Sequence, residues 1–272
     1  MKKIIFILPI FCLLLTFLSC HKNEEPIIDI LTTEGLIKVK LFKETPLHRD
    51  NFVKLVEKGY FDGLIFHRAM KDFMIQTGDP NSKKASRNRL LGTGGPGYTI
   101  PAEINYPKIF HKRGMLSASR LPDADNPDKA SNGSQFSIIQ GRVFSSADLD
   151  TIEMEAYNRQ LDIVWQQIVA KNRSKIDAIS LRGTKEQLIA YQDSLALQAN
   201  KNMEKETVFF FTNEQRKAYT TVGGAPHLDD EYTIFGEVIE GLDVAEKISL
   251  LPIDIHFRPI KDVRIISAKV VE

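Results

Sequence analysis

Apolar and polar residues alternate over residues 28–41, near the start of the chain. Ile37, Val39 and Leu41 are separated by lysines, and a polar segment with a glycine at 33–35 divides this run from an apolar-rich run before it. Alternation with a period of two is typical of a strand with one buried face, and a short glycine-containing segment is typical of a turn. The pattern therefore predicts a β-hairpin over residues 28–41.

Helical spacing follows directly after this hairpin. Pro46 suits the first turn of a helix, Phe52 and Leu55 lie on one helical face, and Gly59 ends the pattern, so we expect a short helix capped by Thr45. Many short strand-like runs with two helices favour a closed barrel capped at its ends. The further strands are expected at residues 63–68, 74–77, 114–119, 136–139, 232–238 and 263–271, and the second helix at 241–250.

The middle of the chain breaks this pattern. Between Gly141 and Gly223 there is no proline and a single glycine, Gly183. Segments 184–187 and 212–215 have the form of capping boxes, in which a threonine is followed three residues later by glutamine. We therefore expect an inserted α-helical hairpin over residues 145–219, which includes a third, short helix after Thr212. Apolar residues at helical spacing in its first helix are Leu149, Ile152, Ala156, Leu161, Val164, Trp165 and Ile168.

Two interpretations of the apolar face around Trp165 stay open. The simpler is a seam between two helices, because apolar helix faces usually bury against each other. The alternative is a surface for a protein partner, which would let the insertion dock onto a membrane-associated complex.

The first twenty residues form a targeting segment of their own. Two lysines precede a nearly unbroken apolar run at 4–17, which is too short to span a membrane comfortably but suits a secretory signal. Ser19-Cys20 at its end resembles the lipobox of bacterial lipoproteins. This resemblance implies a signal peptide at 1–19, lipidation of Cys20, and a lipidated tether at 20–27.

Two points about this segment have alternatives. The signal peptide could be cut elsewhere, which would make Cys20 incidental. The polar residues 21–26 either resemble the acidic export signal of Bacteroidetes-type surface lipoproteins or are a solvated linker. With lipidation, we expect a membrane anchor in the cell envelope, at the outer membrane, on its periplasmic face or on the cell surface.

The composition narrows the chemistry. Thirty-six basic and 35 acidic residues give a net charge of +1, so no nucleic-acid partner is indicated. Both cysteines, Cys12 and Cys20, lie in the targeting segment, which leaves no thiol chemistry to the rest of the chain. None of the six histidines forms a pair at metal-ligand spacing. We therefore expect neither a metal nor a cofactor.

Five sequence blocks then resemble one family in its own order. They are Phe66-His67-Arg68 with residues 72–80, Gly94–Glu103, Gly114–Arg120, Asn132–Phe136 and Pro226–Gly236. Together they are similar to the cyclophilin-type peptidyl-prolyl cis/trans isomerases, over residues 29–144 and 220–272. The resemblance implies a mainly β fold: a closed eight-stranded antiparallel barrel capped by two helices. The barrel domain would run over residues 28–272, interrupted by the insertion at 145–219.

The resemblance also implies roles for individual residues. Arg68 would donate toward the proline nitrogen and so favour the twisted imide, with Phe73 and Gln76 beside it as catalytic residues. Proline-containing polypeptides would be the substrates. The residues that would bind them are Met74, Ser119, Arg120, Gln135, Phe136, His227, Leu228 and Tyr232.

One departure from the family pattern separates two hypotheses. Ser137 replaces a residue that is often a second phenylalanine in the proline pocket, so a looser pocket is expected. The first hypothesis is an isomerase that assists the folding of exported proteins. The alternative is a cyclophilin-shaped chaperone or assembly factor that holds clients with weak or no isomerase activity.

Overall fold

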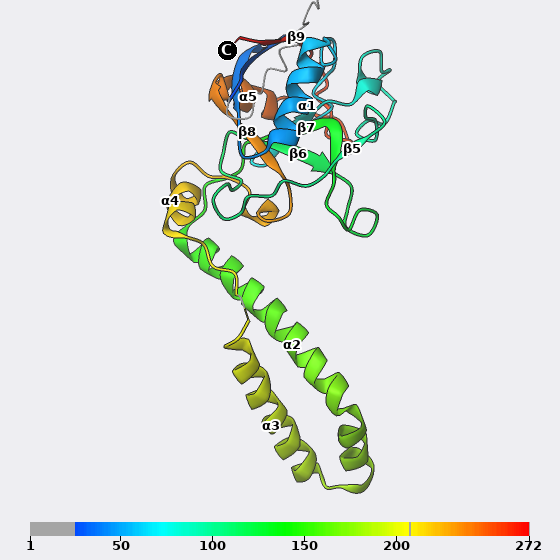
Figure 1. Ribbon diagram of the computed structural model, residues 1–272, viewed down its shortest axis with the longest axis vertical. Coiled ribbons are helices and arrows are strands. Elements are labelled where there is room, and N and C mark those ends of the chain that lie inside the picture. The colour runs from blue at the N-terminus through cyan, green and yellow to red at the C-terminus, as the bar shows by residue number, and fades with distance from the viewer. Residues whose placement is uncertain (1–24, 207, 272) are drawn as a thin grey trace, which may run out of the picture.

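The computed structural model describes residues 25–206 and 208–271. A compact barrel carries a long helical arm that extends away from it (Figure 1). The predicted signal peptide, Cys20 and most of the predicted tether lie outside the described residues. Among the residues that are described, we find no helix with the length and apolarity needed to cross a bilayer.

The barrel is an antiparallel sheet with the strand order β3-β4-β7-β6-β8-β2-β1-β9, to which the short β5 (Thr99–Ile100) is added through β7. Backbone bonds join the two ends: the amide of Gly63 donates to Ile265 O at 2.8 Å, and the amide of Phe66 donates to Val263 O at 2.9 Å. The path therefore closes. Its strands are β1 (Ile27–Thr32), β2 (Gly35–Leu41), β3 (Arg68–Met70), β4 (Met74–Thr77), β6 (Met115–Arg120), β7 (Ser131–Ile139), β8 (Ile234–Glu240) and β9 (Ile265–Val270).

This arrangement confirms the predicted hairpin and the mainly β fold. It corrects one strand: residues 63–68 were expected to be a strand, but β3 begins at Arg68. The segment before it makes the closing bonds, with Ile65 and Arg264 as an isolated bridge.

Two helices cover the barrel and share its core. α1 (Pro46–Glu57) packs on β7, β8 and β9, and α5 (Leu242–Ser249) packs on β2, β3 and β4. Phe52 of α1 and Ile248 of α5 belong to one apolar cluster with the inward-facing strand residues. Two short 3-10 turns, η1 (Pro80–Ser82) and η2 (Pro226–Leu228), complete the barrel domain.

The N-terminus of α1 is capped from a distant segment. Thr45, the predicted cap, makes no capping hydrogen bond with its side chain. The Glu103 carboxylate takes this role instead, since it accepts the amide protons of Leu47 and His48 at 3.0 Å each. A carboxylate at this end also complements the helix dipole.

Between β7 and β8 the chain forms three α-helices, over the residues for which an insertion is predicted, and we keep the name insertion for this segment. α2 (Ser146–Arg182) and α3 (Lys185–Met203) are antiparallel and turn at Gly183, and α4 (Asn213–Thr221) follows. Both predicted capping boxes are present, at Thr184 and Thr212. We call α2 and α3 the arm. Its seam consists of Val164, Ile168, Leu195, Ala199 and Met203, with Trp165 partly buried against them.

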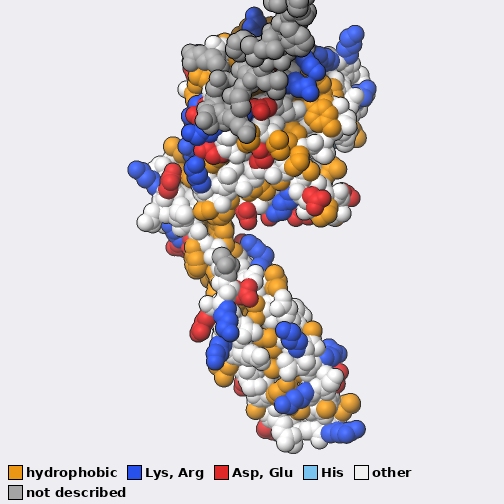
Figure 2. Space-filling model, in the orientation of Figure 1, with side chains coloured by type: hydrophobic (Ala, Val, Ile, Leu, Met, Phe, Trp, Pro, Cys, Tyr) orange, Lys and Arg blue, Asp and Glu red, His pale blue; other side chains and the backbone are white. Residues whose placement is uncertain are grey.

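The arm's surface is mixed. Figure 2 shows basic and acidic side chains interspersed with apolar ones along it, and an open gap between the arm and the barrel. At 1.5 Å per residue, the 37 residues of α2 span about 55 Å.

The arm joins the barrel at a narrow crossing. The amide of Gly224 donates to Arg142 O at 3.1 Å, so the departing and returning chains lie side by side. Gly141 has a φ of +58°, and a Cβ there would lie 2.2 Å from Gly224 O, which only glycine avoids. Beside this crossing an aromatic cluster, which we call the root, joins the insertion to the barrel. Its buried members are Phe110, Phe144, Leu149, Phe211 and Tyr219.

Candidate active site

One row of paired strand residues lines a groove on the outer face of the sheet. In the strand register Arg68 lies opposite Gln76, Gln76 opposite Ser137, and Ser137 opposite Ser117. Directly paired residues point to the same face of a sheet, so four strands present their polar side chains together. The groove holds a cavity of about 150 Å³. Its lining consists of Arg68, Phe73, Met74, Gln76, Ser117, Ala118, Ser119, Arg120, Ser137, Ile139, Leu228 and Tyr232.

One end of the groove is apolar. Met74 lies opposite Ile139 in the register, and both are buried in a cluster that Phe73 and Leu228 join from the side. Phe73 also contacts His227, with ring centroids 5.2 Å apart. Apolar surface of this extent suits a small ring such as that of proline.

The other end is polar and held by hydrogen bonds. The Gln76 amide nitrogen donates to Ser119 Oγ and to Gln135 Oε1, both at 3.1 Å. Gln135 in turn donates to the carbonyl of Gly94 at 2.6 Å. Gln135 therefore supports the groove through Gln76, while Gln76 and Ser119 face it directly.

Arg120 and Tyr232 form a fixed pair on one wall. The Arg120 guanidinium lies 4.6 Å from the centroid of the Tyr232 ring. It donates to Glu231 O at 2.8 Å and to the carboxylates of Glu231 and Asp123 at 2.9 and 2.5 Å. Arg120 thus orders the wall, since its donors are already engaged within the protein.

Arg68 has a different environment. It is half-buried, and its guanidinium lies 5.8 Å from the centroid of the Phe257 ring. Desolvation lowers the pKa of the Arg68 guanidinium, and Tyr232 nearby acts in the opposite sense. An arginine keeps its charge through such shifts, so Arg68 presents a permanent, partly desolvated cation to the groove.

Phe136 is not part of the groove. It is 2% exposed and packs in the barrel core, edge-on to Phe52 and Phe61 at 5.2 and 5.7 Å. Successive residues of a strand point to opposite faces, so the next residue, Ser137, lies in the groove instead. The prediction that Phe136 lines the proline pocket is corrected on this ground.

His227 stands at the rim of the groove. It is exposed on one side and lies against Phe73 on the other, and desolvation lowers the pKa of its imidazole. A neutral ring at this rim extends the apolar wall.

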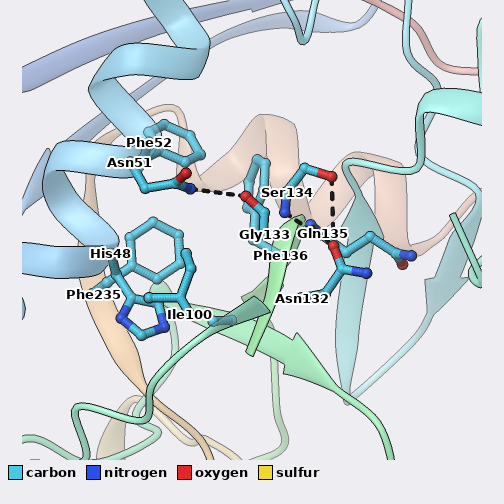
Figure 3. A pocket seen from close by; sticks show the side chains of 11 residues that line it. His48, Asn51, Phe52, Ile100, Asn132, Gly133, Ser134, Gln135, Phe136 and Phe235 are labelled. Carbon is cyan, nitrogen blue, oxygen red and sulfur yellow. Dashed lines mark hydrogen bonds between the residues drawn. The ribbon is translucent and has the colours of Figure 1, made fainter. Parts of the chain in front are cut away.

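The start of β7, which carries Gln135, is firmly held from behind. A small hollow of about 20 Å³ lies between α1 and this strand. Figure 3 shows the side chains that line it. Asn51 of α1 donates to Gly133 O at 2.8 Å, and Asn132 Oδ1 accepts the amide protons of Ser134 and Gln135 at 2.9 and 3.1 Å. A hollow of this size has room for about one water molecule, so it supports the site without being a ligand pocket.

Comparison with known proteins identifies this arrangement. Residues 27–187 and 184–270 match the family described as "Cyclophilin type peptidyl-prolyl cis-trans isomerase/CLD". The chain belongs to this family. It is a member of the cyclophilin-type peptidyl-prolyl cis-trans isomerases, a family of enzymes.

Individual relatives support the assignment over most of the chain. A Staphylococcus saprophyticus protein named "Putative peptidyl-prolyl cis-trans isomerase" is 27% identical over 244 residues, which cover 89% of this chain and 89% of that protein. A Rhizopus delemar protein named "Peptidyl-prolyl cis-trans isomerase-like 2" is 27% identical over 242 residues, which cover 87% of this chain and 27% of the longer relative.

Solved structures confirm the cyclophilin fold. A Cryptosporidium parvum cyclophilin-type isomerase has a TM-score of 0.54 at 21% identity, covering 91% of this chain and 98% of that one. The same protein in the presence of the dipeptide Ala-Pro has a TM-score of 0.53 at 22% identity, covering 90% and 99%.

The cyclophilin groove also includes residues that sequence reasoning missed. Ser117 and Ile139 line it, and His111 lies directly behind Ser117, with Nε2 3.1 Å from Ser117 Oγ. Alternation along the strands could have identified both residues, because residues two apart point to the same face of a sheet. Ser117 is two residues from Ser119, and Ile139 is two residues from Ser137. Nothing in the local pattern around His111 indicated its position. Within the described ranges, no group of three or more His, Cys, Asp and Glu side chains has an arrangement that could hold a metal ion.

Proposed function

We propose that this chain catalyses prolyl cis/trans isomerisation in exported polypeptides, with Arg68 as the central catalytic residue. The observation that carries the proposal is the shared groove, in which the Arg68 cation lies beside an apolar end formed by Phe73, Met74 and Leu228. The dipeptide Ala-Pro, present with the related Cryptosporidium protein, supports proline-containing peptides as ligands.

The reaction needs little chemistry from the protein. Rotation about the imide bond has a barrier of roughly 18–20 kcal/mol, because the nitrogen lone pair is conjugated with the carbonyl. As the bond twists, the prolyl nitrogen regains its lone pair and becomes a hydrogen-bond acceptor. A guanidinium donor placed at that nitrogen favours the twisted state over both planar states. No proton is transferred in this mechanism.

The other groove residues would hold one part of the substrate in place while the other part turns. The apolar end would take the proline ring, and His227 would extend it at the rim. Gln76, oriented by Ser119 and Gln135, would hydrogen-bond the substrate backbone. Arg120 would keep the opposite wall in place through its contact with Tyr232. Holding one half while the other rotates lowers the entropic part of the barrier.

The test is an isomerisation assay on a proline tetrapeptide. Replacing Arg68→Ala removes the donor, and we expect kcat/KM to fall roughly 100-fold or more, as for other preorganised donors. Arg68→Lys keeps the charge but loses the planar fork, so it should restore little of the rate.

The matched control for this assay is Arg173→Ala. It removes an arginine on the arm whose side chain is 71% exposed and should leave the rate unchanged. Full activity in Arg68→Ala would refute the mechanism.

A second candidate function rests on one residue. Ser137 occupies the groove between Gln76 and Ser117, where a larger apolar side chain would close the proline pocket. A chaperone or assembly factor of cyclophilin shape could hold clients in such an open groove without much catalysis. Client binding that survives in a protein with no measurable rate enhancement would favour this alternative, and Ser137→Phe should then raise activity.

We also propose that the protein is anchored in the cell envelope through lipidated Cys20, at the outer membrane. The apolar run at 4–17 followed by Ser19-Cys20 supports this proposal. Acyl chains contribute about 0.8 kcal/mol of membrane affinity per buried methylene, so two or more would hold the protein firmly. Expression with a labelled fatty acid tests the anchor: wild type should incorporate label and Cys20→Ala should not. Equal labelling of both proteins would contradict it.

A further inference from the structure

A buried chain of hydrogen bonds leads from the insertion to the groove. It begins at Tyr219 in α4, whose hydroxyl donates to Asp229 Oδ2 at 2.6 Å. Asp229 Oδ1 lies 3.0 Å from His111 Nδ1 and also accepts the His111 amide proton at 2.8 Å. His111 Nε2 lies 3.1 Å from Ser117 Oγ. Four residues from two stretches of the chain, 111–117 and 219–229, are therefore linked in a single path.

All four residues are shielded from solvent. Tyr219 is 0% exposed, His111 1%, Ser117 3% and Asp229 8%. Water therefore does not compete for these groups, and each hydrogen bond limits the orientation of the next.

The chemistry of the groups sets the direction of the path. A carboxylate only accepts hydrogen bonds, so His111 must carry its proton on Nδ1, facing Asp229. In the neutral ring Nε2 then accepts, and the Ser117 hydroxyl donates to it. The remaining lone pairs of Ser117 Oγ point away from His111, and Ser117 lines the groove. The path thereby fixes which side of the Ser117 hydroxyl a substrate meets.

Tyr219 is itself rigidly placed. Its ring packs edge-on against Phe110, Phe144 and Phe211 in the root, with centroids 5.5, 6.2 and 5.6 Å away. Burial and the nearby Asp229 carboxylate raise the pKa of the Tyr219 hydroxyl, so it stays protonated and can donate. Among the described residues, Tyr219 of the insertion is the one donor to Asp229 Oδ2. A second contact reinforces the path at its far end, since the His111 ring meets Tyr232 of the groove edge-on at 6.4 Å.

We infer that Tyr219 is a positioning residue for the isomerase groove: through Asp229 and His111 it orients the Ser117 hydroxyl, so that the helical insertion completes the active site. The inference rests on the proposed isomerase function. It gives the insertion a role at the reacting end of the molecule, through α4 rather than through the tip of the arm.

The experiment removes one oxygen atom. In the full-length protein, Tyr219→Phe keeps the ring in the aromatic root but loses the donor. We expect kcat on a proline tetrapeptide to fall roughly 3- to 10-fold, the effect of one hydrogen bond of ordinary strength, because the lost bond acts on the groove only through Asp229 and His111. KM should change less than about twofold, because the apolar end that would hold the proline is untouched. Tyr191→Phe is the matched control, since the Tyr191 hydroxyl bonds Asn172 in the arm at 2.8 Å; it should leave kcat unchanged.

Two further measurements separate positioning from damage to the fold. In ¹⁵N-histidine NMR spectra, His111 of the wild type should carry a proton on Nδ1. In Tyr219→Phe the Asp229 carboxylate loses the donor that fixes its second oxygen, so the ring ¹⁵N signals of His111 should shift and broaden. A double-mutant cycle with Ser117→Ala should be non-additive, so that adding Tyr219→Phe to Ser117→Ala lowers kcat less than about twofold.

Each outcome decides the inference. Unchanged kcat in Tyr219→Phe, unchanged ring ¹⁵N signals of His111, or strictly additive effects in the cycle would overturn it. If the wild type itself shows no isomerisation, the proposed function fails. The His111 spectrum then still tests the path, because changed ring ¹⁵N signals in Tyr219→Phe support the link from α4 to Ser117 and unchanged signals refute it.

Discussion

The barrel and the arm are stabilised in different ways. In the barrel, strands from both ends of the chain surround one continuous core, and the sheet closes on itself through the bonds of Gly63 and Phe66. In the arm, the long α2 has three buried residues, Leu149, Val164 and Ile168, and the first of these belongs to the root. The apolar contact of α2 with α3 is the thin seam.

This difference in packing predicts a difference in how the barrel and the arm unfold. A barrel whose strands depend on one another opens only as a unit, whereas a two-helix seam can open by itself. The arm should therefore fluctuate without unfolding the barrel, while α4, held in the aromatic root, stays with the barrel. The part that fluctuates is therefore separated from the part that unfolds with the barrel at a point between the seam and the root. This point is not the crossing where the chain leaves the sheet.

The largest expected effect tests the barrel core. Phe136→Ala removes a ring that packs against Phe52 and Phe61, and we expect the free energy of unfolding to fall by about 3–5 kcal/mol. Urea unfolding followed by tryptophan-independent signals such as far-UV circular dichroism measures it. Phe210→Ala, at a ring 63% exposed, is the control and should change the stability by less than about 0.5 kcal/mol. Equal effects of the two substitutions would contradict a barrel-centred core.

A second prediction uses acid to weaken the barrel selectively. His67 is 5% exposed, neither ring nitrogen has a hydrogen-bond partner among the described residues, and desolvation lowers its pKa from 6.5 to about 4. Above pH 6.5 both folded and unfolded states hold a neutral ring. As the pH falls from 6.5 toward 4, only the unfolded state takes up the proton, so stability should drop by about 3 kcal/mol.

The measurement is the free energy of unfolding at pH 7 and at pH 4. His67→Leu should remove this part of the acid dependence, whereas His256→Gln, at an exposed histidine, should retain it. Hydrogen exchange should locate the acid-induced loss of protection in the barrel. A wild-type loss that persists in His67→Leu would argue against this source.

The smallest expected effect sharpens the description of the arm. Thr184 caps α3 by accepting the amide proton of Gln187 at 3.3 Å, and Thr184→Ala should cost about 1 kcal/mol. Because the seam opens independently, the loss should appear as faster hydrogen exchange in α3 and in the half of α2 that faces it, with barrel amides unchanged. The control is Thr151→Ala, in the part of α2 near the root. It removes the hydrogen bond that the Thr151 hydroxyl donates to Ala147 O. Faster exchange throughout the barrel would show that arm and barrel unfold together.

Much of this fold follows from local pattern. Alternation identified the β1–β2 hairpin, and the capping boxes marked the starts of α3 and α4. The apolar spacing ended near Ile168, yet α2 continues to Arg182 because no helix-breaking residue occurs before Gly183. β7 begins at Ser131, five residues before the expected strand, because its first part pairs with β5 and with Arg120 of β6. Such pairing between distant segments leaves no local signal.

The groove, like the fold, could be predicted only in part. Family motifs brought Arg68, Phe73 and Gln76 together, but a motif gives residues and not the face on which each one lies, which is why Phe136 was misplaced. The path from Tyr219 to Ser117 depends on two distant stretches, 111–117 and 219–229, that meet only in the folded chain. Sequence spacing carries no information about such a meeting.

The crossing at Gly141 and Gly224 has a consequence for the size of the arm. Since the chain leaves and returns at adjacent points, extra residues between them change the closure entropy only slowly, by about 0.6 kcal/mol for each doubling of length. Each added turn in both helices moves the tip outward by about 5.4 Å. The distance between the tip and the catalytic groove is therefore an adjustable dimension, which insertions and deletions can lengthen or shorten while the enzyme at the other end stays the same.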